Sequence, residues 1–314
     1  MLNAKITGTG MYVPKKILDN EYFATTVDTN DVWIRQMTGI QKRHVVTSEK
    51  ASDLATGAAF AALKRSGLEA SHLDLIIVST TQGDLHFPAC ASVVQDRIKA
   101  SRAAAFDLNS GCTGFISALS IATSYIRSGM YRKIMIIGME VLSRVTDYLD
   151  RKTCILFGDG AGAVIIEETY NESGIIDVNL FSDGSMGNLL YCEKMPSGKE
   201  FLRMEGNKIF KHAIEGMVSS SKALMKKHDL HKENISLIIP HQANERIIRM
   251  VAEKMELNMS KIFMNIDRYG NMSSATIPIA LTEALKKDLI KMNDVVLLTA
   301  FGAGLTWGSA LIRW

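Results

Sequence analysis

The sequence predicts an α/β protein made of two duplicated halves, each with a β-sheet covered by helices. Short runs of β-branched apolar residues alternate with helical patterns along the chain, which is typical of mostly parallel sheets. Two sequence patterns also recur in the second half of the chain, in the same order as in the first. No linker rich in proline or glycine separates the halves, so we expect them to pack tightly together.

The first repeated pattern is an amphipathic helix end, a short loop and a buried strand. It occurs as the segment 63–68 followed by the strand 74–78. At a constant offset, the segment 225–230 leads in the same way to the strand 236–240. Each copy is typical of one helix–strand unit of an α/β sheet.

The second repeated pattern is a glycine-rich turn that leads into an apolar strand. It occurs at 157–166 and again at 301–312. One such match could arise by chance in any α/β chain, but two in the same order favour duplication. The polar segment 167–173 interrupts the apolar pattern, so we place an N-terminal half at 1–170 and a C-terminal half at 171–314.

Composition and charge restrict the function classes. The chain has 314 residues, of which 47% are apolar and 22% charged, as in ordinary globular proteins. A net charge of +3 is too small to indicate nucleic-acid binding. The first residues lack the pattern of a signal peptide, and no apolar run approaches the length of a membrane span. We therefore expect a cytoplasmic protein that binds neither nucleic acid nor membrane.

The four cysteines are widely spaced and differ in their surroundings. They are Cys90, Cys112, Cys154 and Cys192, and no two of them form a CxxC pair. This spacing argues against structural zinc and is typical of reduced thiols, so we expect no metal. Cys90 and Cys154 have apolar neighbours and fit a structural role, whereas Cys192 lies beside polar residues and its role is left open.

Cys112 is the candidate nucleophile. An apolar strand ends at Asn109, and a helix begins near Cys112 after Gly111. A thiol at a helix N-terminus lies beside unpaired N–H groups and the positive end of the dipole, which stabilise a thiolate. Gly111 and Gly114 allow the close backbone approach that a nucleophile on a tight turn requires. The alternative is a buried structural cysteine, the commoner fate of this residue type.

Two further strand-to-helix turns carry polar side chains suited to catalysis. His241 follows the strand 237–239 and precedes a helix, so it lies at the carboxyl end of a strand, where α/β sheets bind ligands. Asn271 follows a predicted strand at 262–266 and precedes another helix. Singly, His241 could be structural and Asn271 a helix cap. Three such turns that carry Cys, His and Asn together form a pattern much more specific for a catalytic site.

With these residues in view, the chain resembles the 3-oxoacyl-[acyl-carrier-protein] synthase III family almost from end to end. The segments that carry the resemblance are 111–115, 156–163, 240–244, 270–275 and 300–308. The resemblance implies the five-layered αβαβα thiolase fold with duplicated halves. It also implies a homodimer, and acyl-CoA and acyl-carrier protein as partners.

The resemblance further implies a reaction and a set of catalytic residues. Cys112 would take an acyl primer from acyl-CoA, with the oxyanion held by the backbone N–H groups of Cys112 and Ala303. His241 and Asn271 would donate hydrogen bonds to malonyl-carrier protein during decarboxylation. Attack on the acyl-cysteine would then give a 3-ketoacyl carrier protein and initiate fatty-acid synthesis. No cofactor is expected, because loss of the carboxylate drives formation of the carbon–carbon bond.

Other positions match family residues that bind the substrates. Those expected along the tunnel for acyl-CoA are Trp33, Arg151, Gly206, Phe210, Ala243 and Asn244. Those expected on the basic rim that meets the acidic carrier protein are Arg246, Lys208 and Lys211. For the rim charges, a merely solvated helix face is nearly as good an interpretation. Met37 departs from the family, because many relatives carry an arginine there that helps to hold the nucleotide of CoA.

The same residues bear on related enzymes and on other functions. Asn271 argues against elongating ketosynthases, which have a second histidine at this position. Plant-type polyketide synthases are considerably longer, and hydroxymethylglutaryl-CoA synthases need a glutamate acid/base whose context is not evident. A specialised relative in secondary metabolism remains an alternative. A non-catalytic partner subunit is a remote one, because such subunits commonly lose the nucleophile. A Cys–His hydrolase is a further alternative, and it would differ by consuming acyl-CoA in the absence of any malonyl thioester.

Overall fold

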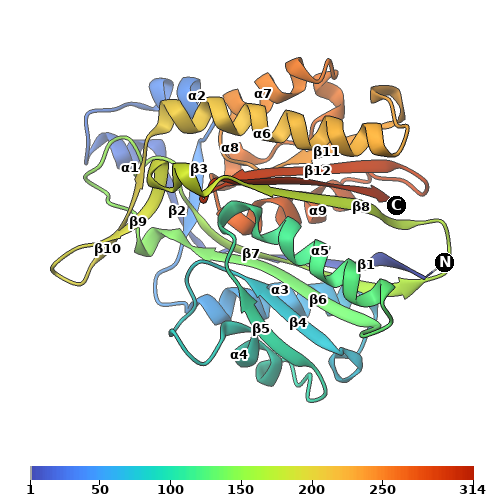
Figure 1. Ribbon diagram of the computed structural model, residues 1–314. Coiled ribbons are helices and arrows are strands. Elements are labelled where there is room, and N and C mark those ends of the chain that lie inside the picture. Colours follow the sequence, from blue (N-terminus) through green and yellow to red (C-terminus); the bar gives the residue numbers. More distant parts are fainter. Residues whose placement is uncertain (1) are drawn as a thin grey trace.

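Two β-sheets with the same internal arrangement form the framework of the protein, seen in the computed structural model of Figure 1, which describes residues 2–314. The five-stranded sheet has the order β1-β7-β6-β4-β5, and the four-stranded sheet has the order β8-β13-β12-β11. The strands of the first are β1 (Asn3–Tyr12), β4 (Leu75–Ser79), β5 (Ala104–Leu108), β6 (Lys133–Val141) and β7 (Asp159–Thr169). The strands of the second are β8 (Gly174–Ser182), β11 (Leu237–Pro240), β12 (Val295–Gly302) and β13 (Thr306–Arg313).

Four strands of the first sheet, β1, β7, β6 and β4, recur in the same order in the second as β8, β13, β12 and β11, which confirms the predicted duplication. β4 and β11 are the strands of the first repeated pattern, and β7 and β13 are those of the second. The first sheet ends with Thr169 and the second begins with Gly174, so the proposed boundary at residue 170 lies in the turn between them.

The sheets are mixed rather than mostly parallel, which corrects one expectation. β4 runs parallel to β5 and β6, and β11 runs parallel to β12. β7 is antiparallel to β6 and to β1, and β13 is antiparallel to β12 and to β8. The connections explain the difference. β12 and β13 are joined by the short turn 303–305, and a turn of this length can join only antiparallel strands.

Helices and sheets alternate in five layers, as Figure 1 shows from α3 and α4 at the bottom to α6 and α7 at the top. The helices of the outer and central layers are α3 (Ala51–Ser66), α4 (Cys90–Arg97), α5 (Gly114–Arg127), α6 (Gly206–Lys227), α7 (Glu245–Lys254) and α9 (Thr276–Lys286). The apolar faces of α5 and α9 pack between the sheets in one continuous core. Two further cores join α3 and α4 to the first sheet, and α6 and α7 to the second. The predicted α/β class and its layering are confirmed.

Smaller elements lie at the end of the layers where the strand-to-helix turns gather. They are the hairpin β2 (Lys16–Asp19) and β3 (Lys42–Val45), the hairpin β9 (Leu190–Lys194) and β10 (Glu200–Met204), and the helices α1 (Asn20–Ala24), α2 (Asp31–Thr38) and α8 (Ile266–Tyr269). The predicted strand 262–266 is wrong. Only Ile262 forms a bridge, with Ile238, and the chain then turns into α8. No helix within residues 2–314 combines the length and apolar character that crossing a bilayer requires.

Candidate active site

Cys112 lies in a single turn of 3-10 helix, Gly111–Thr113, between the end of β5 and the start of α5. The buried face of α5 fixes this helix between the two sheets, so its N-terminus is held at the cysteine. Gly111 has φ +51°, a left-handed conformation that favours glycine. On the opposite side Gly302, the last residue of β12, allows the two backbones to approach closely. A Cβ atom on Gly302 would lie 2.8 Å from the backbone nitrogen of Cys112.

The thiol of Cys112 is held in its protonated form at neutral pH. Burial raises the pKa of the Cys112 thiol to about 11, although the Ser273 hydroxyl and the backbone N–H groups of Cys112 and Ala303 act to lower it. The stabilising groups predicted at this helix end are therefore in place, but desolvation outweighs them. The two N–H groups proposed for the oxyanion hole lie beside the sulfur, where an acyl carbonyl would be attached.

His241 is a buried, neutral imidazole. Only 2% of its surface is exposed, and burial lowers the pKa of the ring to about 3. Its Nδ1 lies 2.6 Å from Thr276 Oγ1, which is also 3.0 Å from the carbonyl oxygen of Ser273. The single hydroxyl hydrogen of Thr276 therefore selects the tautomer. Donated to the Ser273 carbonyl, it leaves Oγ1 to accept from Nδ1–H. Donated to Nδ1 instead, it leaves the ring's proton on Nε2, which is the tautomer that can donate a hydrogen bond to a ligand.

The amide of Asn271 is oriented by its own turn. Its Oδ1 accepts the backbone N–H of Ser273 at 2.8 Å, and its backbone N–H donates to the carbonyl oxygen of Leu156 at 2.9 Å. Because the amide oxygen is occupied, Nδ2 remains as the group that can donate to a ligand. The side chain is 8% exposed, so a hydrogen bond from it is shielded from water.

One cavity of about 440 Å³ brings these residues together. Cys112, His241 and Asn271 all line it, as does Ala303. Of the residues predicted for substrate binding, those that line this cavity are Trp33, Gly206, Phe210, Ala243, Asn244 and Arg246. Lys208 and Lys211 do not line it and lie exposed on α6, as a solvated helix face would. Among residues 2–314, no group of three or more His, Cys, Asp or Glu side chains could hold a metal ion.

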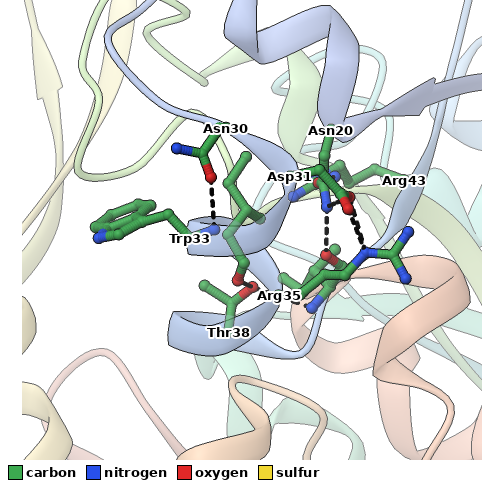
Figure 2. Close-up of polar contacts among 9 residues, drawn as sticks. Asn20, Asn30, Asp31, Trp33, Arg35, Thr38 and Arg43 are labelled. Carbon is green, nitrogen blue, oxygen red and sulfur yellow. Dashed lines mark hydrogen bonds and ion pairs between the residues drawn. The ribbon is translucent and has the colours of Figure 1, made fainter.

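Trp33 is presented to the cavity by α2, whose opposite side is fixed by a polar network (Figure 2). Asn30 caps the helix by accepting the N–H of Trp33 at 2.8 Å. On the other side, the buried Asn20 donates to Asp31 at 2.8 Å and accepts from Arg43 at 2.6 Å. Arg151, which does not line the cavity itself, places its guanidinium 4.3 Å from the centre of the Trp33 ring. These two side chains, both predicted along the tunnel for acyl-CoA, therefore stack on each other.

Several polar residues of the site were missed by sequence reasoning. Ser273 and Thr276 lie within the turn that carries Asn271, yet nothing in the pattern separates them from ordinary turn residues. Glu140 is 0% exposed and lies on β6, where its carboxylate accepts hydrogen bonds from Thr81 and Ser273. A single acidic residue within the apolar run 133–141 is a signal from which a buried carboxylate could have been predicted.

The contact between Gly302 and Cys112 gives a testable expectation for the geometry of the turn. In Gly302→Ala, the new methyl group would meet the backbone of Cys112 and displace the thiol from the N–H groups beside it. Since a misplacement of about 1 Å can cost about 10²-fold in rate, we expect acyl transfer to the cysteine to fall by about that factor. Gly184→Ala is the control, because a Cβ atom there meets nothing within 4 Å. Acylation of Gly302→Ala at the native rate would contradict the proposed geometry.

Comparison with known proteins gives a consistent result over the whole chain. The family models for 3-oxoacyl-[acyl-carrier-protein] synthase III and for its C-terminal part match residues 106–184 and 225–314. A β-ketoacyl-[acyl-carrier-protein] synthase III of Clostridium acetobutylicum is 44% identical, with 100% of this chain and 99% of that protein covered. The crystal structure of the Aquifex aeolicus 3-oxoacyl-[acyl-carrier-protein] synthase III has a TM-score of 0.96 at 43% identity, covering 99% and 100%.

A more distant neighbour is the priming β-ketosynthase of the R1128 polyketide pathway, with a TM-score of 0.95 at 28% identity, covering 99% and 96%. Its fold is nearly the same, but its sequence is much further from this chain than those of the two bacterial synthases. Motifs, architecture and full-length identity agree, and the chain belongs to the 3-oxoacyl-[acyl-carrier-protein] synthase III family.

Proposed function

We propose that this protein condenses an acyl primer, delivered as acyl-CoA, with malonyl-carrier protein to give a 3-ketoacyl carrier protein and carbon dioxide, the first condensation of fatty-acid synthesis. The observation that carries the proposal is the meeting of Cys112, His241 and Asn271 in one largely buried cavity. The purified protein is expected to form the 3-ketoacyl product only when both thioesters are present. Consumption of acyl-CoA in the absence of malonyl-carrier protein, with release of free acid, would instead indicate a hydrolase.

In the first half-reaction the sulfur of Cys112 attacks the thioester carbonyl of the primer. The carbonyl oxygen becomes an oxyanion beside the N–H groups of Cys112 and Ala303, which already flank the sulfur. Such a donor typically contributes about 3 kcal/mol to the barrier, because it is oriented before the charge develops. CoA leaves as a thiolate, and the primer remains on Cys112.

In the second half-reaction the malonyl group enters the same cavity. Nε2–H of His241 and Nδ2–H of Asn271 donate to its thioester oxygen, so that loss of carbon dioxide gives a stabilised enolate. The low pKa of His241 keeps the ring neutral, and Thr276 holds it by Nδ1. The enolate carbon attacks the acyl-cysteine and expels the thiolate of Cys112. The proposed reaction needs no metal or redox cofactor, because decarboxylation itself generates the nucleophile.

The mouth of the cavity offers contacts for the pantetheine arm that CoA and carrier protein share. Asn244 donates from Nδ2 to the backbone carbonyl of Met37 at 3.0 Å and thereby fixes α7 against α2. The guanidinium of Arg246 lies 3.7 Å from the sulfur of Met37 and 5.4 Å from the centre of the Phe210 ring. Many relatives have an arginine at the position of Met37. In this chain that position is uncharged, so Arg246 supplies a positive charge at this part of the mouth.

Arg246 supplies a prediction about the carrier protein. Charge reversal in Arg246→Glu should raise the KM for malonyl-carrier protein roughly tenfold at low salt and weaken its salt dependence, because a steering contact with an acidic partner is lost. Acyl-CoA acylation should change much less. The matched control is Lys254→Glu, which makes the same charge change on α7 away from the cavity. Equal effects of Arg246→Glu on both substrates would count against a docking role.

A homodimer is part of the proposal. β5 is one of the two edge strands of the first sheet within the described chain, and its unpaired backbone groups suit pairing with a second copy. In the segment between β4 and α4, Leu85 and Phe87 are 65% and 84% exposed, and exposed apolar side chains of this size favour burial in an interface. The greater distance of the polyketide enzyme in sequence favours fatty-acid initiation over a specialised role.

A further inference from the structure

The proposed reaction leaves one proton without a destination. Cys112 is a thiol at neutral pH, yet it must attack as a sulfur nucleophile. Cys112 lines the cavity, so an acyl-CoA arm bound there would take the place of solvent at the sulfur. Among the described residues near the sulfur, two side chains could then receive the proton: His241, which lines the same cavity, and Glu140, whose charge acts on the thiol.

His241 is poorly suited to receive this proton. Burial lowers the pKa of its ring to about 3, so a charged imidazolium is strongly disfavoured. A hydrogen on Nε2 is also what the enolate requires of it, and the contact of Nδ1 with Thr276 allows this in the neutral ring. The histidine can therefore serve the second half-reaction without ever taking the thiol proton.

Glu140 has the opposite properties. It is fully buried on β6, and among residues 2–314 no cation forms an ion pair with it. Burial raises the pKa of Glu140 to about 7, against hydrogen bonds from Thr81, Ser273 and Ser274 that lower it. Its partners are thus hydroxyl and amide donors, and the titratable group that faces it is the thiol of Cys112. Near neutral pH this carboxyl can both accept and release a proton.

The geometry links this carboxyl to the sulfur through one hydroxyl. Thr81 fixes one carboxylate oxygen with its hydroxyl at 2.7 Å and its N–H at 3.2 Å. Ser273 Oγ donates to the other oxygen at 3.1 Å, and the same hydroxyl lies near enough to Cys112 to lower the pKa of the thiol. The backbone of Ser273 has φ +46°, rare for a residue with a side chain, and its N–H is held by Asn271. The Ser273 hydroxyl thus adjoins both the Glu140 carboxylate and the Cys112 thiol.

We propose that Glu140, acting through the hydroxyl of Ser273, takes up the proton of Cys112 during attack on acyl-CoA and returns it after condensation. In the first step the S–H proton moves to Ser273 Oγ, the Ser273 proton moves to Glu140, and the sulfur–carbon bond forms. CoA leaves as a thiolate and is protonated by solvent. In the second step the enolate expels the thiolate of Cys112, which regains its proton from Glu140 through Ser273.

This inference rests on the proposed function and adds an electrostatic consequence. While Glu140 holds the proton, the site has no buried anion of its own when the negatively charged enolate develops. An ionised Glu140 would instead repel that charge across the cavity. Glu140 accordingly holds the proton without touching the substrate. It acts on the substrate only through Ser273 and Cys112, as a positioning residue.

The test is the pH profile of single-turnover acylation by acyl-CoA. For the native protein we expect the rate to rise through about pH 7, where Glu140 ionises, and then to level off. Glu140→Gln, which keeps the size of the side chain, should lose this step and acylate roughly 10²-fold more slowly at pH 8. Ser273→Ala should show the same loss with the carboxylate in place, and His241→Ala should keep the step. A thermal melt of each variant confirms that it is folded.

The sign of the effect separates the proposal from its rivals. If Glu140 only repelled the thiolate, Glu140→Gln would acylate as fast as the native protein or faster at pH 8, which would overturn the inference. Loss of the step in His241→Ala, with its retention in Glu140→Gln, would assign the proton to the histidine. If the native protein itself formed no acyl-enzyme, the proposed function would fail together with the inference. Normal native acylation with unaffected Glu140→Gln and Ser273→Ala would defeat the inference alone.

Discussion

Cys112→Ala is expected to abolish both formation of the acyl-enzyme and condensation. The substitution removes the sulfur but leaves the turn Gly111–Thr113 and the packing of α5 unchanged, so the fold should be retained. Loss of a covalent nucleophile typically costs on the order of 10⁴–10⁶ in rate, since the residual reaction relies on binding and oxyanion stabilisation alone. Condensation should therefore fall by about that factor.

The measurement combines intact mass after incubation with acyl-CoA and product analysis with both thioesters. Cys192→Ala is the matched control, because Cys192 also lines the cavity but is exposed on β9. The control should acylate and condense as the native protein does. Substantial condensation by Cys112→Ala would show that the acyl group is carried elsewhere.

Removal of the two donors to the enolate should have the next largest effect, confined to the second half-reaction. We expect His241→Ala and Asn271→Ala still to accept an acyl group, while each loses malonyl decarboxylation by about 10²–10³-fold, the usual effect of one donor to a developing oxyanion. Neither side chain is needed to hold the acyl carbonyl, which lies beside the N–H groups of Cys112 and Ala303.

Asn271→Asp sharpens this prediction. The aspartate can still accept the N–H of Ser273 with one oxygen, so the turn is preserved. It replaces the Nδ2 donor with a group that carries negative charge and would repel the enolate. Decarboxylation should therefore be at least as slow as in Asn271→Ala. Acyl transfer and release of carbon dioxide are measured separately, and a variant that fails to acylate yet decarboxylates normally would reverse the assigned roles.

Much of the architecture follows from local patterns in the sequence. The repeated helix–strand units and glycine-rich turns predicted the duplication, because a buried strand and an amphipathic helix are each recognisable over a few residues. Strand direction was harder to predict. β7 and β13 look like any other apolar strand, and only the length of the connection before β13 shows that it must run antiparallel.

The active site was predictable to the extent that its residues occupy turns between strands and helices. Cys112, His241 and Asn271 all do so, and the fold brings the three turns to one cavity. Glu140 lies next to the end of β6 and Thr276 at the start of α9, where the sequence suggests only burial or capping. Which charged side chains line the cavity was the least predictable feature. Arg246 reaches the cavity and Lys208 does not, because their positions depend on tertiary contacts between α6 and α7.

The central claim, that Cys112 carries the acyl primer, can be tested directly on the native protein. The other cysteines offer clear alternatives: Cys90 and Cys154 are buried, and Cys192 is exposed at the same cavity. After incubation with a panel of acyl-CoA thioesters, intact mass followed by peptide mapping should find one acyl group, on the peptide that contains Cys112. An acyl group on any other cysteine, or no acyl group from any member of the panel, would contradict the account.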